Sequence, residues 1–267
     1  MLFMKKFAIA YNKKIENSAD VMKELRDTLE NHNAEPVLLD IDNLEDGFDF
    51  VFVIGGDGTI LKAARFYAKY STPIFGVNLG RLGFLSQCAR DDIKTSVEKI
   101  LGGHYRVEDR VMLQSGNRLA LNDFVVKGTS TGRTSKFSLK INNKPLCDYL
   151  ADGIIISTPT GSTAYGLSAG GPVISPSLGA FVIVPICPHT LTARPIVIPD
   201  DEVITVSTGC SDVNYVASTD GQEFYEFKSE INIQKSEYTA KLALLEGVGF
   251  YSILKDKLHW GTSPAVI

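Results

Sequence analysis

Short apolar runs alternate with helix-periodic segments over the first hundred residues. Buried strands of a parallel sheet are typically continuous apolar runs, and helices between such strands provide right-handed crossovers. The pattern therefore predicts a parallel α/β sheet with helices on both faces. Strands are expected at 7–11, 37–39, 50–54 and 74–77. Helices are expected around the apolar positions between Val21 and Leu29, over residues 60–70 and over residues 91–101.

Beyond His104 the apolar period changes from helical to alternating. Residues 136–150 alternate, turn at Asn142 and Asn143 and return, which predicts a β-hairpin. We therefore expect an α/β domain over 1–104, to which the tail 246–267 returns, and a β-rich, sandwich-like domain over 105–245. Further strands are expected at 203–206, 213–217, 222–227, 231–233 and 242–245, and a helix at 250–258.

Composition excludes several classes of function. The 267 residues have a net charge of −4 with dispersed lysines and arginines, so no basic surface for nucleic acid is expected. Lys5 and Lys6 interrupt the apolar start, and no apolar run is long enough to span a membrane. The four cysteines are far apart, without metal or redox spacing. We expect a soluble cytoplasmic protein with reduced, mostly buried cysteines, bound to neither nucleic acid nor membrane.

The sequence GGDGT at 55–59 directly follows an apolar strand. Its glycines allow a tight turn and a close approach of ligand to backbone, and Thr59 is an expected cap for the next helix. Asp57 is the only ionisable residue of the turn, at the strand end where open α/β sheets bind ligands. The turn has neither a Walker lysine nor GxGxxG spacing. Asp57 is therefore either a structural acceptor for backbone amides or a catalytic carboxylate.

Three more stretches are dense in glycine and small polar residues: 76–84 (GVNLGRLGF), 121–125 (LNDFV) and 151–172 (ADGIIISTPTGSTAYGLSAGGP). A strand sends neighbouring side chains to opposite faces, so either one of Asn122 and Asp123 is solvated or a bulge turns both to one side. One of the two capping a sheet edge is the structural alternative. In the longest stretch, hydroxyl groups can bind ribose and phosphate, Tyr165 can stack on a base and Asp152 can accept a hydrogen bond.

Taken in order, GGDGT, NLGRLGFL, LND, DGIIISTPTGSTAYGLSAGGP, PICPHTLTARPIVIP and DGQ resemble the NAD kinase family from about Phe50 to Gln222. The STPTGSTAY block is specific, whereas GGDGT is shared with diacylglycerol, sphingosine and phosphofructokinase-type kinases. The resemblance implies transfer of the γ-phosphate of ATP, or of polyphosphate in some members, to the 2′-hydroxyl of the adenosine ribose of NAD. It also implies an α/β and a β-rich domain, a divalent metal such as Mg²⁺, and a homodimer or homotetramer.

The same resemblance implies roles for individual residues. Asp57 matches the proton acceptor for the 2′-hydroxyl, with Gly58 beside it. Lys62 matches a site where some members place a basic residue near phosphate. Asn122 and Asp123 match an Asn followed by Asp or Glu that binds ribose and base.

Other matches lie further along the chain. Arg133 falls where the family often has a basic residue or histidine, Asp152 matches an aspartate that binds the carboxamide end, and Gln222 matches a substrate-contacting glutamine. Leu150 departs from the pattern, because some members have an arginine there. The block that matches the adenine and ribose cradle includes Thr163, Ala164, Tyr165 and Ser168.

Two other functions are compatible with parts of the sequence. A diacylglycerol-type lipid kinase shares GGDGT, but the STPTGSTAY block and the lack of an amphipathic or basic segment for a bilayer oppose it. A non-catalytic dinucleotide sensor could retain the pocket without turnover, but Asp57 is present. We therefore expect in-line phosphoryl transfer, with Asp57 as the base.

Overall fold

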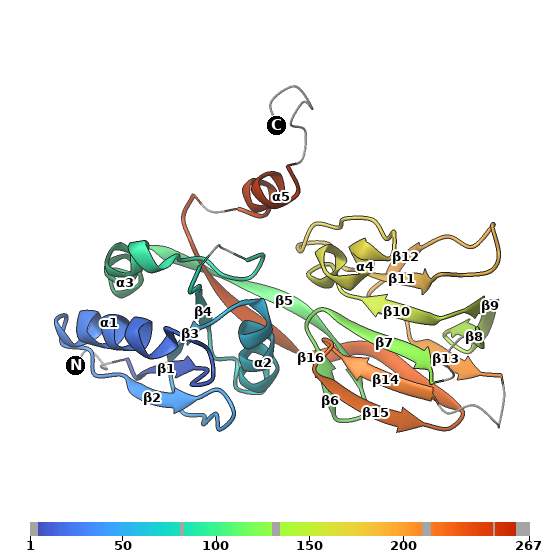
Figure 1. Cartoon of the computed structure of the whole chain (residues 1–267), viewed down its shortest axis with the longest axis horizontal. Coiled ribbons are helices and arrows are strands. Elements are labelled where there is room, and N and C mark those ends of the chain that lie inside the picture. Colours follow the sequence, from blue (N-terminus) through green and yellow to red (C-terminus); the bar gives the residue numbers. More distant parts are fainter. Residues whose placement is uncertain (1–4, 81–82, 130–133, 210–214, 248, 260–267) are drawn as a thin grey trace. The chain divides into compact units, whose positions relative to one another are not determined.

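The chain divides into two compact units in the computed structural model, which describes residues 5–80, 83–129, 134–209, 215–247 and 249–259. Unit 1 comprises residues 1–109 and 240–267, and unit 2 comprises residues 110–239 (Figure 1). An α/β first unit and a β-rich second unit are the predicted fold class. The predicted domain boundaries, 104/105 and 245/246, lie five and six residues from the boundaries of the units, at positions where single long strands run from one unit into the other.

Unit 1 is built on a parallel sheet with the order β2-β1-β3-β4, which the end of β16 extends. The registers of β1 with β2 and β3, and of β3 with β4, bring the carboxyl ends of all four strands to one edge, here called the carboxyl edge. The elements of unit 1 are β1 (Phe7–Tyr11), α1 (Ser18–Glu30), β2 (Val37–Asp40), β3 (Phe50–Ile54), α2 (Asp57–Tyr67), β4 (Ile74–Val77), α3 (Ile93–Leu101) and α5 (Phe250–Leu258).

Burial explains the layers of unit 1. All five residues of β3 are buried, as their unbroken apolar run predicts. Phe50 and Phe52 share a core with the apolar sides of α1 and α3. On the other face α2 packs so closely that a Cβ on Gly76 of β4 would overlap the side chain of Ile60. The buried sheet thus presents its strand ends, not its faces, to a ligand.

Unit 2 contains two antiparallel sheets. One has the order β12-β11-β10-β7-β14-β15, and the other joins the first part of β16 to β13, β8 and β9. Buried residues of both sheets, such as Phe124 and Phe137, form one core. The elements are β5 (Tyr105–Ser115), β6 (Arg118–Ala120), β7 (Asp123–Gly128), β8 (Ser135–Ile141), β9 (Lys144–Ala151), β10 (Gly153–Ser157), α4 (Tyr165–Ser168), β11 (Ala180–Ile186), β12 (Ile196–Pro199), β13 (Ile204–Thr208), β14 (Tyr215–Thr219), β15 (Glu223–Phe227) and β16 (Glu230–Leu245).

Three local expectations are wrong. Helix α2 begins at Asp57 with Gly56 as its N-cap, so Thr59 is not the cap, and only a 3-10 turn follows Tyr67. The expected strands 231–233 and 242–245 are one strand, β16, which continues through the mostly polar residues between them. Of the three cysteines that the structure describes, only Cys88 is buried.

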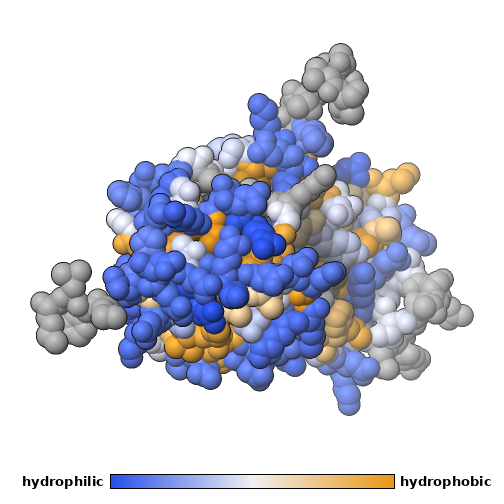
Figure 2. Space-filling model, turned by 60° about the vertical axis from the view of Figure 1, so that its left-hand side comes forward, coloured by the Kyte–Doolittle hydropathy of each residue, from blue (hydrophilic) through white to orange (hydrophobic). Residues whose placement is uncertain are grey.

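The surface seen in Figure 2 is mainly hydrophilic, with hydrophobic residues in scattered patches. Within the described ranges, no helix is long and apolar enough to cross a membrane.

Candidate active site

Asp57 lies at the carboxyl edge of unit 1, where β3 ends and α2 begins. Its side chain is half-buried. Its Oδ2 accepts a hydrogen bond from the Phe84 amide at 2.9 Å, and its Oδ1 accepts one from the Leu85 amide at 3.2 Å. Two amide donors stabilise negative charge on the carboxylate and fix its orientation. The GGDGT turn therefore presents one oriented carboxylate at the strand ends.

The segment after β4 is shaped around Asp57. A Cβ on Gly83 would overlap the Asp57 carboxylate, so this position requires glycine. The Gly83 amide donates to Ser86 Oγ at 2.6 Å, and Asn78 Nδ2 donates to the same oxygen at 3.2 Å. Asn78 and Ser86 are buried. The stretch GVNLGRLGF thus forms a close-packed turn that supports the carboxylate.

Lys62 of α2 contacts a carboxylate at the same edge. Lys62 Nζ lies 2.6 Å from Asp42 Oδ1, and Lys14 Nζ lies 2.7 Å from Asp42 Oδ2. Hydrogen bonds, the larger contribution from Lys14 and the smaller from Lys62, lower the pKa of Asp42 to about 2. Asp42, which follows β2, thus brings together Lys14, which follows β1, and Lys62 of α2.

Unit 2 contains a pocket of about 420 Å³. Alternate residues of β7, Asp123, Val125 and Lys127, line it together with residues of β14, because successive side chains of a strand point to opposite faces. The pocket is lined by Asn122, Asp123, Val125, Lys127, Ala164, Tyr165, Val216, Ser218, Asp220, Gly221 and Phe224.

Asp220 organises the polar end of this pocket. It lies in the loop between β14 and β15 with a positive φ of 51°. Its Oδ1 accepts from the Asn122 amide at 2.7 Å and the Asp123 amide at 3.2 Å, and its Oδ2 accepts from the Leu121 amide at 3.1 Å. Asp220 therefore fixes the LND turn from a position almost 100 residues away. The DGQ motif contains this residue, but the family resemblance assigns a contact only to Gln222.

The long serine- and glycine-rich stretch closes against the same turn. The Asn122 carbonyl accepts from the Thr158 amide at 2.9 Å and from Ser157 Oγ at 3.2 Å. A Cβ on Gly161 would overlap that carbonyl. Asn122 and Asp123 both line the pocket without a bulge, because Asn122 precedes β7 and strand alternation does not apply to it.

Asp123 is the buried titratable group of the pocket, with 4% of its surface exposed. Burial, and secondarily the nearby Asp220 carboxylate, raises the pKa of Asp123 to about 7. Near neutral pH both the protonated and the ionised forms of this carboxyl group are therefore populated. In its protonated form it can donate a hydrogen bond to a neutral acceptor such as a ring nitrogen or a ribose oxygen.

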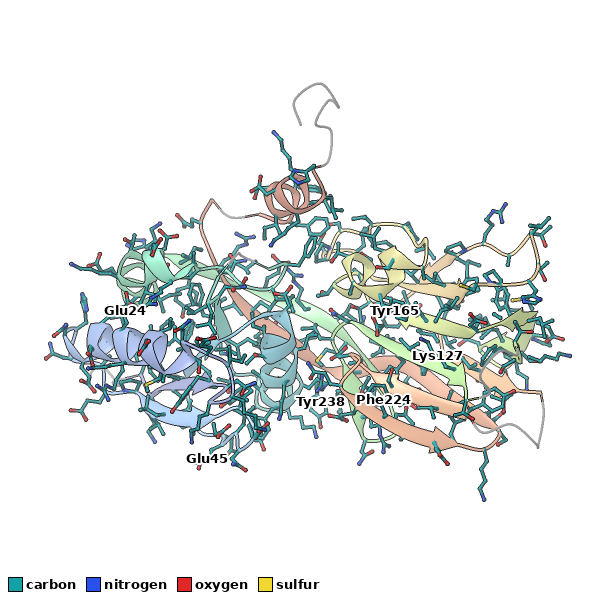
Figure 3. All side chains as sticks on the ribbon, viewed as in Figure 1. Glu24, Glu45, Lys127, Tyr165, Phe224 and Tyr238 are labelled. Atoms are coloured by element: carbon teal, nitrogen blue, oxygen red, sulfur yellow. The ribbon has the colours of Figure 1, made fainter. Side chains whose placement is uncertain are left out.

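An exposed aromatic pair and one lysine complete the lining. Tyr165 is 38% exposed and Phe224 is 69% exposed. Lys127 Nζ donates to Tyr165 Oη at 3.1 Å and lies 5.0 Å from the centre of its ring. Figure 3 labels these three side chains, which come from α4, β7 and β15. Two aromatic side chains at a concave pocket with a few polar groups provide surfaces on which a planar base can pack.

The structure gathers some of the expected site residues and not others. Asn122, Asp123, Ala164 and Tyr165 line the unit 2 pocket. Thr163 and Ser168 flank Ala164 and Tyr165 without lining it, and Gln222 follows the lining residue Gly221. Asp152 is exposed between β9 and β10, and its amide donates to the Ile186 carbonyl at 3.0 Å. Asp57, Gly58 and Lys62 belong to α2 of unit 1, and Arg133 lies outside the described residues.

Comparisons with known proteins cover both units. The model of the ATP-NAD kinase N-terminal domain matches residues 3–105, and that of the ATP-NAD kinase C-terminal domain matches residues 121–245. A protein named NAD kinase from Thermoanaerobacter sp. (strain X514) is 38% identical over 280 residues, which cover 96% of this chain and 99% of the relative. Another NAD kinase, from Azoarcus sp. (strain BH72), is 42% identical over 230 residues, covering 81% of this chain and 77% of the relative.

Two solved structures have the same fold. An NAD kinase from Archaeoglobus fulgidus, solved in complex with ATP, is 28% identical in sequence and has a TM-score of 0.81. The match covers 95% of this chain and 98% of that chain. The structure of yeast NADH kinase complexed with NADH has a TM-score of 0.84 at 21% identity, covering 97% of this chain and 89% of its own, and so supports the fold alone.

Proposed function

The chain belongs to the NAD kinase family and phosphorylates NAD to NADP, and from this premise we propose that Asp57 accepts the proton of the adenosine 2′-hydroxyl. The orientation of the Asp57 carboxylate supports this role most directly. An ionised carboxylate has about four lone-pair sites, of which the Phe84 and Leu85 amides use two. The remaining lone pairs can accept a proton as the bond to phosphorus forms.

The unit 2 pocket is proposed to bind the adenosine part of NAD. Its volume of about 420 Å³ and its aromatic lining suit a purine nucleoside, with Tyr165 or Phe224 against the base. Asn122 and Asp123 then contact the base and ribose. Asp220 acts through them, because its hydrogen bonds go to their backbone amides. Thr163, Ala164 and Ser168 are proposed to belong to the same cradle.

The phosphoryl donor is proposed to be ATP bound with Mg²⁺. Mg²⁺ usually binds through one or two carboxylates together with substrate phosphates, rather than in a cage made only of protein groups. Among the described residues, no group of three or more histidine, cysteine, aspartate or glutamate side chains could hold a metal ion. Such an ion would neutralise charge on the phosphoryl group that is transferred.

The roles proposed for the remaining site residues rest on the resemblance to the family. Asp152 and Gln222 are assigned to substrate contacts, Arg133 to a basic position, and Gly58 to the turn beside Asp57. A homodimer or homotetramer and a cytoplasmic location are proposed on the same ground. Leu150, where some members have an arginine, is 44% exposed on β9, so any contact that the arginine makes elsewhere is absent here.

The test is conversion of NAD to NADP with ATP and Mg²⁺, followed by Asp57→Asn. We expect kcat to fall by about 10²–10⁴-fold, the usual contribution of a general base, with little change in NAD affinity. Calorimetric titration with NAD serves as the control for folding and binding. Near-normal turnover of the variant would refute the assignment of Asp57.

The same assay separates the alternatives. A diacylglycerol offered beside NAD should remain unphosphorylated, whereas a lipid kinase would consume it. Tight NADP binding without ADP release from ATP and NAD would indicate a sensor without turnover.

A further inference from the structure

Residues from three elements meet at the carboxyl edge of unit 1. Lys14 follows β1, Asp42 follows β2, and Lys62 belongs to α2, whose first residue is Asp57. Because β1 pairs with both β2 and β3 in register, the segments after β1 and β2 lie one and two strands from the GGDGT turn. Strand spacing places the ends of β1 and β2 about 5 and 10 Å from the end of β3.

Three lysines are paired with two aspartates at this edge. Lys14 and Lys62 share the Asp42 carboxylate at 2.7 and 2.6 Å, and Lys13 pairs with Asp40 at 3.3 Å. Asp57 at the same edge balances the third lysine, so the edge is formally neutral and its positive charge is concentrated at the two ammonium groups that share one carboxylate. An ammonium group has three donors, and each of Lys14 and Lys62 uses one of them on Asp42. Two ammonium groups therefore lie close together with donors left for an anion.

A contribution to folding alone does not account for this arrangement. The side chains of Lys14, Lys62 and Asp42 are 81%, 41% and 43% exposed, and exposed ion pairs add little stability. Without Asp42, two ammonium groups that both lie within hydrogen-bonding distance of one carboxylate would repel each other. Lysine is a common point-charge ligand for phosphate, especially where strand ends and a glycine turn leave backbone accessible.

We propose that Lys14 and Lys62, positioned by Asp42, bind the phosphate chain of the phosphoryl donor. The inference rests on the proposed function, which places phosphoryl transfer at the GGDGT turn. It adds Lys14 and Asp42 to the site and assigns the ligand by its charge, so that ATP and inorganic tripolyphosphate use the same two lysines. Asp42 is a positioning residue, since it contacts the lysines and not the donor.

The experiment measures kinetic constants for Lys14→Met, Lys62→Met and the double variant. We expect the KM for ATP to rise on the order of tenfold for each single variant, as loss of one charged phosphate contact implies, while the KM for NAD changes less than about twofold. Tripolyphosphate should inhibit the parent protein competitively with ATP and the double variant on the order of tenfold less well. An unchanged KM for ATP in the folded double variant would overturn the proposal.

Two further variants separate binding from structure. Lys241→Met is the matched control, because Lys241 also forms a 2.6 Å ion pair, in this case with Asp109. Lys241 precedes Leu242, which pairs with Ile74 at the end of β4 that is opposite the carboxyl edge. It should leave both KM values unchanged. Asp42→Asn should raise the KM for ATP several-fold without changing the KM for NAD. Parallel rises in both KM values would indicate a structural role and contradict the inference.

Direct binding distinguishes failure of this inference from failure of the Asp57 assignment. Titration of NAD-saturated protein with the β,γ-imido analogue of ATP requires no phosphoryl transfer. Weaker binding by the lysine variants supports the phosphate site even if Asp57→Asn retains turnover. Equal binding by parent and variants refutes it, whatever the result for Asp57.

Discussion

Asp57 of unit 1 and Asp123 of unit 2 are aspartates in two different environments. Asp57 is half-buried, and two backbone amides donate to its oxygens. Asp123 is 4% exposed, and burial beside Asp220 raises its pKa to about 7. The first environment fixes the orientation of a carboxylate, and in the second burial raises the pKa of the carboxyl group. We propose that the oriented Asp57 acts as the base for the ribose hydroxyl, and that Asp123 in its protonated form donates a hydrogen bond to a neutral acceptor.

This contrast separates chemistry from recognition in terms that experiments can test. Changes around Asp57 should lower kcat and spare NAD affinity. Changes around Asp123 should alter NAD affinity and the pH dependence of folding.

Gly83→Ala should have the largest effect. The added Cβ would overlap the Asp57 carboxylate, so the side chain must move from its position between the Phe84 and Leu85 amides. Displacement of a catalytic group by about 1 Å can cost about 100-fold in rate. We therefore expect kcat to fall about 100-fold or more, while NAD affinity, measured by calorimetric titration, stays within about twofold of the parent.

Gly80→Ala is the matched control for that change. Gly80 lies in the same glycine-rich segment, but a Cβ there meets no atom within 4 Å. Its kcat should stay near that of the parent protein. A comparable loss in both variants would show that the segment, and not the position of Asp57, limits turnover.

Asp220→Ala should have the next largest effect, on the other side of the comparison. The variant removes acceptors from the amides of Leu121, Asn122 and Asp123. Hydrogen bonds to charged groups contribute about 1.5–3 kcal/mol each, and relief of the repulsion with Asp123 offsets part of the loss. We expect the free energy of unfolding in urea to fall by about 2–4 kcal/mol and the Kd for NAD to rise about tenfold or more.

Asp220→Asn tests the cause of that effect. Its carboxamide oxygen retains one acceptor for the same amides in nearly the same shape, so the losses should be clearly smaller than for alanine. If alanine and asparagine gave the same small change, hydrogen bonding by Asp220 would not organise the pocket.

Local pattern in the sequence was sufficient for much of this architecture. The apolar run of β3 and the GGDGT turn located Asp57, and the alternation beyond His104 predicted the β-rich unit. The LND and STPTGSTAY stretches also identified Asn122, Asp123 and Tyr165, and the family resemblance added Ala164; the pocket brings these four residues together. These features succeed because strand burial and turn chemistry depend on neighbouring residues.

Contacts between distant segments could not be predicted in the same way. Asp220 lies 98 residues from Asn122, and Asp42 lies 20 residues from Lys62. No local period relates such pairs. The start of α2 was also misplaced, because Thr59 is an ordinary cap residue, whereas the close fit between Gly55 and the Thr59 side chain becomes visible only in three dimensions.

Within one pH unit, the change in folding free energy that is expected from Asp123 is smaller than the losses above. A carboxyl group with a pKa near 7 when folded and about 3.9 when unfolded stabilises the fold fully below pH 4, and this stability is lost as pH rises to 7. The loss is at most about 1.4 kcal/mol per pH unit. Asp123→Asn lacks this titration, so its free energy of unfolding relative to the parent should rise from pH 5 to 7 and level off above pH 8.

Asp148→Asn provides the control for this pH dependence. Asp148 is exposed, and hydrogen bonds from Ser138 and then Lys136 hold the pKa of its carboxyl below its usual value. It therefore titrates below the tested range, and urea unfolding of this variant should show no gain over the parent between pH 5 and 8. If the Asp123→Asn difference were equally flat, Asp123 would be ionised throughout that range. Recognition of neutral groups in the pocket would then have to come from Asn122 and the aromatic side chains instead.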